Sequence, residues 1–333
     1  LLPREFADIL ATLRDRGYAM PDAQLEEVLI EGLGADYADK LRHFEREPFA
    51  AASIGQVHRL RTRDGRAAVL KVQYPGIRES IDSDVDNLAS LLSMSGLLPK
   101  HMDMVPLLEE AKTQLHEEAD YEQEARYLKA FVRALGDDER FLIPRLIPHL
   151  SATRILGMTY VPGIPIEEVA HETAAERSRV LGLLFELLMI ELFQLRLVQT
   201  DPNFANYRYH TTTGQVALLD FGASRRFKVG LIRSYRELLV AAIDADRPAM
   251  IRAAESIGYD LGPDGSVYRE TLLDLAELVL VPLTHNQPYD FGRSDIPQEV
   301  LKRVEVLKSD RAFWQSPPMD VAYIHRKIGG LFM

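Results

Sequence analysis

Three side chains that suit metal and phosphate chemistry lie close together in the second half of the sequence. Asp201 and Asn206 belong to Gln199-Thr200-Asp201-Pro202-Asn203-Phe204-Ala205-Asn206, and Asp220 begins Asp220-Phe221-Gly222 after a short predicted hairpin. Two carboxylates and an amide on adjacent loops can hold a divalent metal against a nucleoside triphosphate and direct a base at an acceptor. Upstream elements must then supply a cover for the phosphates and a lysine.

Lys71 is the candidate lysine. The alternation in residues 57–61, the turn at Asp64-Gly65 and the β-rich run 67–73 predict a hairpin with Lys71 on its second strand. A small-residue stretch precedes this hairpin. Against the kinase pattern GxGxxGxV it reads AxAxxGxV, and Lys71 stands where VAIK places its lysine. The residues in register are Ala50, Ala52, Gly55 and Val57.

Alanine changes what such a loop can do. Glycine tolerates positive φ and lets the backbone approach a phosphate closely, whereas alanine is penalised for both, so we expect the phosphates to be covered differently. From these residues alone, a second interpretation is equally good: Ala50, Ala51, Ala52 and Ser53 are a strand entry, and Lys71 is a solvated lysine at a strand edge.

An acid-rich turn follows, in a stretch that the apolar spacing predicts as one helix over residues 104–135. Glu117, Asp120 and Glu124 would share one face of this helix, with Glu118 one step round. An HExxH zinc site is disfavoured because Asp120 stands where the second histidine is needed. The turn is either a solvated charged face or the source of the carboxylate that holds a kinase lysine on the phosphates. Its position after the lysine strand favours the carboxylate.

The best domain boundary is the cluster Pro162-Gly163-Ile164-Pro165, which ends two strand-like runs, 141–148 and 153–161. We therefore expect an N-terminal lobe over residues 1–161 and a mostly helical lobe over residues 162–333.

Met158 to Val161 would form the hinge between these lobes. Backbone groups of this segment, including those of Met158 and Tyr160, would meet the edge of an adenine. Taken by itself, Met158 is equally well an ordinary core side chain.

The loops that carry the three polar side chains are framed by a predicted apolar helix over residues 174–197 and a predicted strand over residues 215–219. Asp201 and Asn206 have the spacing of the kinase HRDxxxxN loop, and Asp220 begins a DFG triplet. Each match is weak alone, but all occur in kinase order. No Ala-Pro-Glu triplet follows, which disfavours peptide phosphorylation. Further amphipathic helices are predicted over residues 232–243, 249–257, 267–281 and 297–307.

Composition limits the partners. The chain has 333 residues, of which 47% are hydrophobic, enough for one large or two moderate domains. A net charge of -11 argues against a nucleic-acid surface and a polybasic membrane patch. The absence of cysteine excludes disulfides and thiolate metal sites.

No run of about eighteen apolar residues occurs, so we expect a chain that is soluble as given, cytoplasmic or on the peripheral face of a membrane. Since the chain begins at Leu1 without a methionine, any targeting or anchoring segment would lie outside it.

The sequence resembles the UbiB/ADCK atypical kinases, the aarF-domain proteins linked to coenzyme Q biosynthesis, over nearly its whole length. The phrases that carry the resemblance are PFAAASIGQVHRL, AVLKVQYPGI, EADYEQEA, QTDPNFANY, LLDFGASRRF and HRKIGG. Their combination is far more specific than any bare kinase motif. It implies an α/β, atypical protein-kinase-like fold of two lobes, with extra helices at the N-terminus and around the carboxylate helix.

The resemblance also implies roles for individual residues. Ala50 to Ser53 correspond to an Ala-rich nucleotide loop and Lys71 to the strand lysine. Glu118 and Asp120 match an ExD element, while Glu124 is the favoured partner of Lys71, although the sequence leaves the choice between Glu118 and Glu124 open. Asp201 corresponds to the catalytic-loop acid, and the implied metal ligands are Asn206 and Asp220.

What this implies for function is binding of ATP and Mg²⁺, ATPase or phosphotransferase activity on a small or lipid-like acceptor, and support of ubiquinone biosynthesis. Lipids, quinone precursors and quinone-biosynthesis enzymes are the expected partners. The alternative is a nucleotide-gated scaffold or lipid-binding chaperone that does not turn over. Two family features have no counterpart in the chain, the KxGQ helix that folds over the site and the membrane anchor of some members.

Overall fold

The computed structural model describes residues 19–52, 54–95, 105–284, 289–290, 293–309 and 318–332. Ser53 of the Ala-rich stretch lies outside these residues. The chain forms two compact units, Leu1–Phe185 with Asn203–Ser224, and Glu186–Pro202 with Arg225–Met333. The lobe boundary expected after residue 161 does not coincide with this division and stays a prediction.

The first unit is built on a five-stranded sheet in which β1, β3, β4 and β6 lie in that order and β2 pairs with β3. The predicted hairpin is confirmed, because β3 and β4 pair antiparallel on either side of the Asp64-Gly65 turn. The strands are β1 (Leu41–Phe44), β2 (Ala50–Ala52), β3 (Gly55–Thr62), β4 (Ala67–Gln73) and β6 (Ile155–Thr159).

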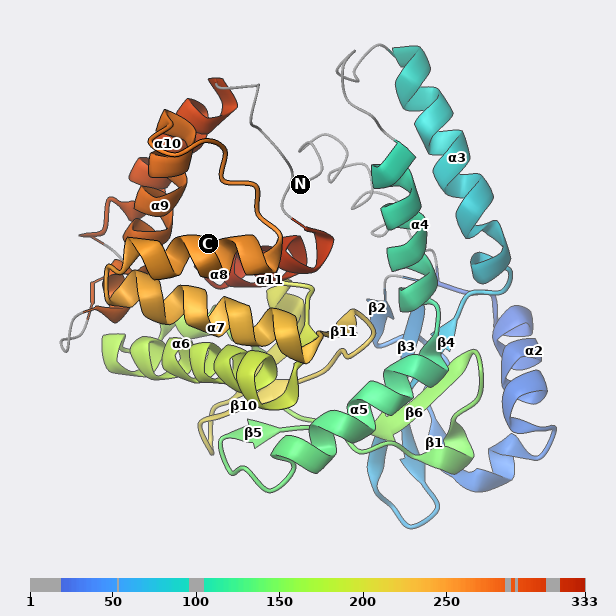
Figure 1. Cartoon of the computed structure of the whole chain (residues 1–333). Coiled ribbons are helices and arrows are strands. Elements are labelled where there is room, and N and C mark those ends of the chain that lie inside the picture. Colours follow the sequence, from blue (N-terminus) through green and yellow to red (C-terminus); the bar gives the residue numbers. More distant parts are fainter. Residues whose placement is uncertain are drawn as a thin grey trace. The chain divides into compact units, whose positions relative to one another are not determined.

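Helices α2 (Asp22–Leu33) and α5 (Tyr121–Leu135) lie on opposite sides of this sheet (Figure 1). α2 begins after Pro21, and Gly34 ends it with φ of 90°. Its apolar residues, Leu25, Val28, Leu29 and Leu33, pack with Leu60, Leu70, Val72 and Ile155 of the strands. Beyond the sheet, α3 (Ile77–Ser95) and α4 (Val105–Glu118) are joined by the ion pair Lys112–Asp86 at 2.7 Å and by a hydrogen bond between His116 and Asp82 at 3.0 Å.

The prediction of one helix over residues 104–135 is wrong, because α4 ends at Glu118 and α5 begins at Tyr121. Asp120 lies between them with non-helical dihedrals, and its side chain accepts a hydrogen bond from the Gln123 N–H at 2.8 Å. Such N-capping favours a new helix start over continuation of the old one. Glu117, Asp120 and Glu124 therefore do not share one helix face.

A second sheet of the first unit has the order β5-β10-β9-β7. The predicted strand over residues 215–219 is confirmed as β10, which pairs antiparallel with β9 and parallel with β5. The strands are β5 (Phe141–Leu142), β7 (Ile164–Pro165), β9 (Tyr207–His210) and β10 (Gln215–Leu218). The prediction of a strand over residues 141–148 is wrong beyond Leu142, where Pro144 and Pro148 lack the N–H that a ladder requires.

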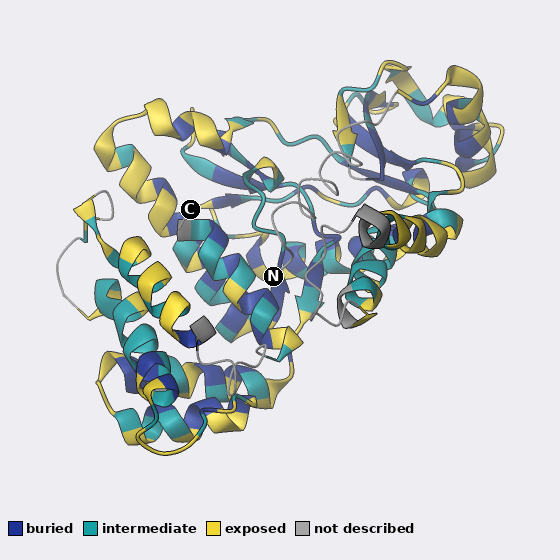
Figure 2. Cartoon of the chain, turned by 90° about the horizontal axis from the view of Figure 1, so that it is seen from above, coloured by how far each residue is buried: buried dark blue, intermediate teal, exposed yellow. Residues whose placement is uncertain are grey.

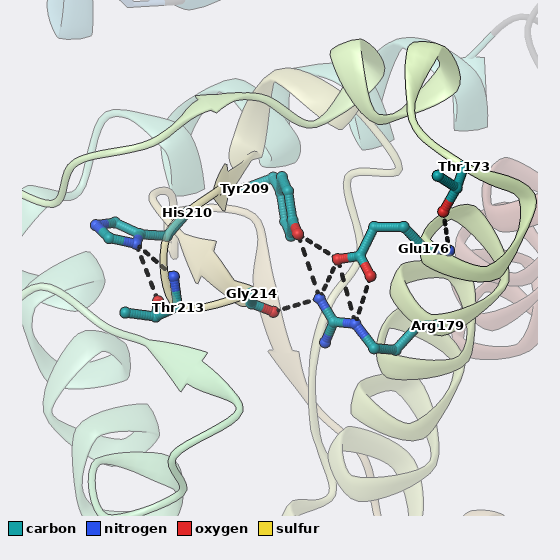
Figure 3. A network of polar contacts seen from close by, with 7 residues as sticks. All are labelled: Thr173, Glu176, Arg179, Tyr209, His210, Thr213 and Gly214. Carbon is teal, nitrogen blue, oxygen red and sulfur yellow. Dashed lines mark hydrogen bonds and ion pairs between the residues drawn. The ribbon is translucent and has the colours of Figure 1, made fainter.

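The first turn of α6 (Ala174–Met189) is tied to the hairpin of β9 and β10 (Figure 3). Oε1 of Glu176 accepts hydrogen bonds from Nε of Arg179 at 3.2 Å and from Nη2 of Arg179 at 2.5 Å. It also accepts one from the Tyr209 hydroxyl. Arg179 also donates to the Gly214 carbonyl at 2.7 Å. These side chains line a shallow polar hollow. Since Arg179 and Glu176 already bind one another, we interpret this network as structural.

The second unit is helical. The helix predicted to reach Leu197 is wrong at its end: a π-helical turn at Ile190–Leu195 follows α6, Arg196 is left-handed with φ of 51°, and Leu197 starts β8. β8 (Leu197–Gln199) pairs with β11 (Ser224–Arg226). The remaining predicted helices are confirmed as α7 (Val229–Ile243), α8 (Arg247–Ile257), α9 (Val267–Leu280) and α10 (Ile296–Ser309). Figure 2 shows their buried faces in dark blue and their exposed faces in yellow.

Helix α11 (Met319–Phe332) packs into the core of this unit through Val321, Tyr323 and Ile324. Its last turn lies against the loop that follows β8. A Cβ at Gly330 would overlap the Pro202 ring, whereas a Cβ at the neighbouring Gly329 would meet no atom within 4 Å. Close packing of α11 on Pro202 therefore requires glycine at 330.

We predict that Gly330→Ala lowers the free energy of unfolding by about 1–3 kcal/mol, the usual cost of an overpacked methyl group. Gly329→Ala is the matched control and should be neutral or stabilising by up to about 1 kcal/mol, because alanine favours the helix. Denaturant titrations compare the two variants. Equal effects of both would contradict the packing of α11 on Pro202.

The Glu176 network predicts a pH dependence of stability. Its hydrogen bonds with Arg179 and Tyr209 lower the pKa of Glu176 from 4.5 to about 2. A lowered folded pKa gives stability that is present above the unfolded pKa and is lost as pH falls towards the folded one. The melting temperature of Glu176→Gln should thus lie below that of the wild type at pH 6, with the gap narrowing below pH 4.5 towards pH 2.

Glu168→Gln is the control, since Glu168 is exposed and forms no ion pair with the described residues. A gap between Glu176→Gln and wild type that stays constant from pH 6 to pH 3 would contradict this role of the carboxylate.

Candidate functional site

Strand β4 carries apolar and polar side chains on opposite faces, because successive residues of a strand alternate. Leu70 and Val72 belong to the core under α2. Lys71 and Gln73 point to the other face, where α5 lies. The Gln73 side-chain amide donates to the Ala119 carbonyl at 3.0 Å and so fixes the chain just before α5 begins. The strand is buried on both faces, and Lys71 is thereby directed at α5.

Lys71 lies between two carboxylates. Its Nζ is 3.0 and 2.9 Å from the two carboxylate oxygens of Glu124 and 3.2 Å from Oδ2 of Asp220. The side chains of Lys71 and Glu124 are only 8% and 1% exposed, whereas that of Asp220 is 36% exposed. The choice that the sequence left open is thus answered in this structure: Glu124 pairs with Lys71. Glu118 lies at the end of α4 and accepts from the Gln114 amide at 3.3 Å.

The charges of this group depend on one another. Burial alone would lower the pKa of Lys71, but the negative charges of Asp220 and Glu124 outweigh it and raise the pKa well above its usual value. Burial raises the pKa of Glu124, while the charge of Lys71 acts in the opposite direction. Lys71 is therefore held as a cation. Of its two carboxylate partners, Asp220 is the more exposed.

The hairpin of β9 and β10 brings Asn206 and Asp220 to one place. Asn206 directly precedes β9, and Asp220 follows β10 by two residues. The backbone closes this base of the hairpin, since the Leu219 N–H donates to the Asn206 carbonyl at 2.9 Å. Oδ1 of Asp220 accepts from the Gly222 N–H at 2.8 Å, which fixes one carboxylate oxygen. An amide and a carboxylate are oxygen donors of the kind that Mg²⁺ prefers.

Phe221 anchors the DFG triplet. It is buried, and its ring centroid lies 5.1 Å from that of Phe131 on α5. The Phe221 backbone also acts to lower the pKa of the nearby Glu124 carboxylate. The triplet and α5 are therefore joined by an aromatic contact and by the shared Lys71.

Asp201 belongs to the second unit, where α11 supplies its neighbours. Arg326 lies 3.4 Å from the Asp201 carboxylate, and Lys327 donates to the Gln199 side chain at 3.0 Å. Glu191 is fully buried beside them, and burial raises its pKa to about 7 against the opposing charge of Lys327. The loop that carries Asp201 is thus held by side chains about 125 positions away in the sequence.

The Ala-rich stretch is a strand. Ala50, Ala51 and Ala52 form β2 and pair antiparallel with Val57, Gln56 and Gly55 of β3. A Cβ at Gly55 would collide with the Val72 carbonyl, which explains the glycine there. Ala50 and Ala51 are exposed and available to a ligand. Their role in nucleotide binding stays a prediction.

The predicted hinge starts within the sheet. Met158 lies in β6, where it is buried and pairs with Val69 of β4. The Tyr160 N–H donates to the Ala67 carbonyl at 3.0 Å, so this group already has a partner. The Tyr160 ring lies at an angle to Phe49, with centroids 6.4 Å apart, and a contact of this segment with an adenine stays a prediction.

Two features of this region were not predicted from the sequence. Tyr121 is buried at the start of α5 with its ring centroid 5.1 Å from Lys71 Nζ. Gln56 and His58 are buried on the α2 side: His58 Nδ1 is 2.9 Å from the Glu45 carbonyl, and its Nε2 is 2.8 Å from the Gln56 amide. Their strict alternation in the predicted strand placed Gln56 and His58 on one face, but nothing in the pattern indicated burial.

Two properties of the described residues limit other sites. They contain no group of three or more His, Asp or Glu side chains arranged to hold a metal ion. None of their helices is both long and apolar enough to cross a membrane.

Known proteins resemble this chain over most or all of its length. The model of the ABC1 atypical kinase-like domain matches residues 12–254. The mitochondrial atypical kinase coq-8 of Caenorhabditis elegans is 35% identical over all of this chain and 44% of its own length. The mitochondrial atypical kinase COQ8 of Saccharomyces cerevisiae is 33% identical, with 100% of this chain and 66% of its own length covered. The chain thus spans about half to two thirds of these relatives.

A solved structure shares the fold. Rv3197 of Mycobacterium tuberculosis, determined in complex with erythromycin, superimposes with a TM-score of 0.73 at 24% sequence identity, over 99% of this chain and 83% of that one. The kinase-like fold and the resemblance expected from the sequence are confirmed: the chain belongs to the ABC1 atypical kinase-like family, the group of the COQ8 and UbiB/ADCK proteins.

Proposed function

We propose that this chain is an ATP-binding, kinase-like protein with ATPase or phosphotransferase activity on a small or lipid-like acceptor. The observation that carries the proposal is the buried Lys71–Glu124 pair with Asp220 at 3.2 Å from the same ammonium group. Burying such charges is costly unless they are paired, so a protein retains them where the arrangement has a use. In kinases, the use of a lysine held by a helix carboxylate is to bind the α- and β-phosphates.

Mg²⁺ fits the donors at the base of the hairpin. Asn206 and Asp220 offer one amide and one carboxylate, and the described residues contain no group of three or more His, Cys, Asp or Glu side chains that could hold a metal by themselves. Mg²⁺ commonly binds through one or two carboxylates and completes its shell with phosphate oxygens and water. This donor set therefore suits a metal that arrives with ATP, whose charge it would offset beside Lys71.

The other predicted residues complete the proposal. Ala50, Ala51, Ala52 and Ser53 would cover the phosphates, and Met158 and Tyr160 would face the adenine. Glu118 would lie near the nucleotide, as its match to the ExD element implies. Asp201, five positions before Asn206, would orient the attacking hydroxyl or water.

The biological setting follows from the relatives. The similar proteins carry the names of mitochondrial COQ8 kinases, and the resemblance implies support of ubiquinone biosynthesis. The acceptor would then be a quinone precursor or lipid at a membrane surface, with quinone-biosynthesis enzymes as partners.

A non-catalytic scaffold or lipid-binding chaperone gated by nucleotide is the second candidate. The extended Ala50–Ala52 strand favours it, because alanine Cβ atoms restrict the close approach of the backbone to phosphates. The presence of Asp201 favours the enzyme, since a scaffold needs no catalytic-loop acid.

Nucleotide binding should appear as thermal protection. Mg-ATP at about 100 times its dissociation constant adds about 2.7 kcal/mol of stability, which raises the melting temperature of the wild type by several degrees. Glu124→Gln should lose most of this rise, because Lys71 is no longer held in place. Glu122→Gln, an exposed glutamate on the same helix, is the control and should keep it. Absence of any rise in the wild type at saturating Mg-ATP would refute nucleotide binding.

Turnover should depend on Asp201. We expect Asp201→Asn to reduce phosphate release from ATP by about 10²- to 10⁴-fold, the usual contribution of a general base, while thermal protection by Mg-ATP is retained. The assay measures phosphate release with and without added lipid vesicles. Equal rates near background in the wild type and Asp201→Asn, with protection intact, would instead support the scaffold.

A further inference from the structure

A small pocket lies on the outer side of α5. It has a volume of about 320 Å³. Half of its lining comes from α5 itself, and the other half from the segment that precedes β6. The lining residues are Lys129, Val132, Arg133, Arg145, Leu146 and Pro148.

This pocket is distinct from the group around Lys71. At 100° per residue, Lys129, Val132 and Arg133 lie about 80° to 180° round the helix from Glu124. The burial agrees, since Glu124 and the residues on its side of α5 are buried, whereas Lys129 and Arg133 are exposed. A ligand here would contact the side of α5 that does not face β4.

Its charge is unusual for a chain with a net charge of -11. Three cations, Lys129, Arg133 and Arg145, meet at the pocket, and no aspartate or glutamate is among its lining residues. Within the described part of the chain, none of the three side chains forms an ion pair. Lys129 and Arg133 also stand four positions apart on one helix, where like charges disfavour each other. An anion bound between them would relieve this repulsion.

The remaining lining is apolar. Val132, Leu146 and Pro148 offer no hydrogen-bonding side chain, and Val132 and Leu146 are half-buried. An inorganic anion would use the cations but leave this surface in contact with water. The volume lies at the lower end of the range for small-molecule pockets, and the planar guanidinium groups of Arg133 and Arg145 match a carboxylate or phosphate group.

We propose that this pocket binds a small amphipathic anion, with a carboxylate or phosphate group between Arg133 and Arg145 and an apolar body on Val132, Leu146 and Pro148. The ligand would join α5 to the segment next to β6, where the Thr159 hydroxyl accepts from the Arg145 N–H at 2.8 Å. This proposal is independent of nucleotide binding.

Calorimetric titration of the whole chain with five probes tests it. Benzoate and phenyl phosphate combine an anion with an apolar ring, acetate and inorganic phosphate supply the charge alone, and benzamide supplies the ring alone. At least one of the two ring-bearing anions should bind at least tenfold more tightly than the charge-only probe with the same anionic group and than benzamide. Comparison of the two identifies the preferred anionic group.

The double variant Arg133→Gln, Arg145→Gln should weaken that binding at least tenfold. The double variant Arg233→Gln, Arg236→Gln changes the net charge equally at two exposed arginines of α7 and should bind as the wild type does. Arg133→Lys with Arg145→Lys keeps the charge without the planar group and should give an intermediate affinity.

Three results would overturn the proposal. One is the absence of binding by both ring-bearing anions. Another is that the ring-bearing anion that binds more tightly has no higher affinity than the charge-only probe with the same anionic group, or no higher affinity than benzamide. The third is unchanged affinity in the folded Arg133→Gln, Arg145→Gln variant.

Discussion

The buried ion pair between Lys71 and Glu124 is the interaction on which the candidate site depends. Removing one partner of such a pair typically costs about 3–5 kcal/mol, because the other charge is left buried. The pair also joins residues that are 53 positions apart and fixes α5 on the sheet. Asp220 approaches the same ammonium group from a third element. The positions of the strand, the helix and the DFG triplet are therefore interdependent within the first unit.

Local backbone features make this pair possible. Alternation along β4 separates the core side chains from Lys71 and Gln73. Asp120 caps the N-terminus of α5, so this helix begins at Tyr121, three residues before Glu124. On the other side of the site, the tight hairpin of β9 and β10 places Asn206 beside the residue that precedes Asp220. None of these features is specific to kinases, but together they place a cation and the two proposed metal ligands within one unit.

The sequence predicted the motifs better than the contacts. Period-two alternation and an Asp-Gly turn were enough for β3 and β4, and the six phrases that resemble the UbiB/ADCK proteins were enough for the family. The break between α4 and α5 was missed because the apolar spacing continues through it, although Asp120 and Gln123 carry a recognisable cap pattern.

Other features could not be predicted, because they depend on contacts distant in sequence. The choice of Glu124 over Glu118 depends on where α5 starts and on the Phe221 backbone. The contacts of α11 with the loop that carries Asp201 involve Arg326, Lys327 and Gly330. In the sequence alone, these residues look like part of an ordinary helix. The parallel pairing of β5 with β10 likewise joins segments some 75 residues apart. Periodicity reports local structure and the exposed side of an element, but not its partner.

The central claim is that Lys71, Asn206 and Asp220 together hold ATP and its metal. A crystal structure of the chain with Mg²⁺ and a non-hydrolysable ATP analogue tests it most directly. We predict a Mg²⁺ ion about 2.0–2.1 Å from oxygens of Asn206, Asp220 and the phosphates, with the Lys71 ammonium on the α- and β-phosphates and its pair with Glu124 intact. A nucleotide bound elsewhere, or one whose phosphates contact neither Lys71 nor the metal at Asp220, would contradict it.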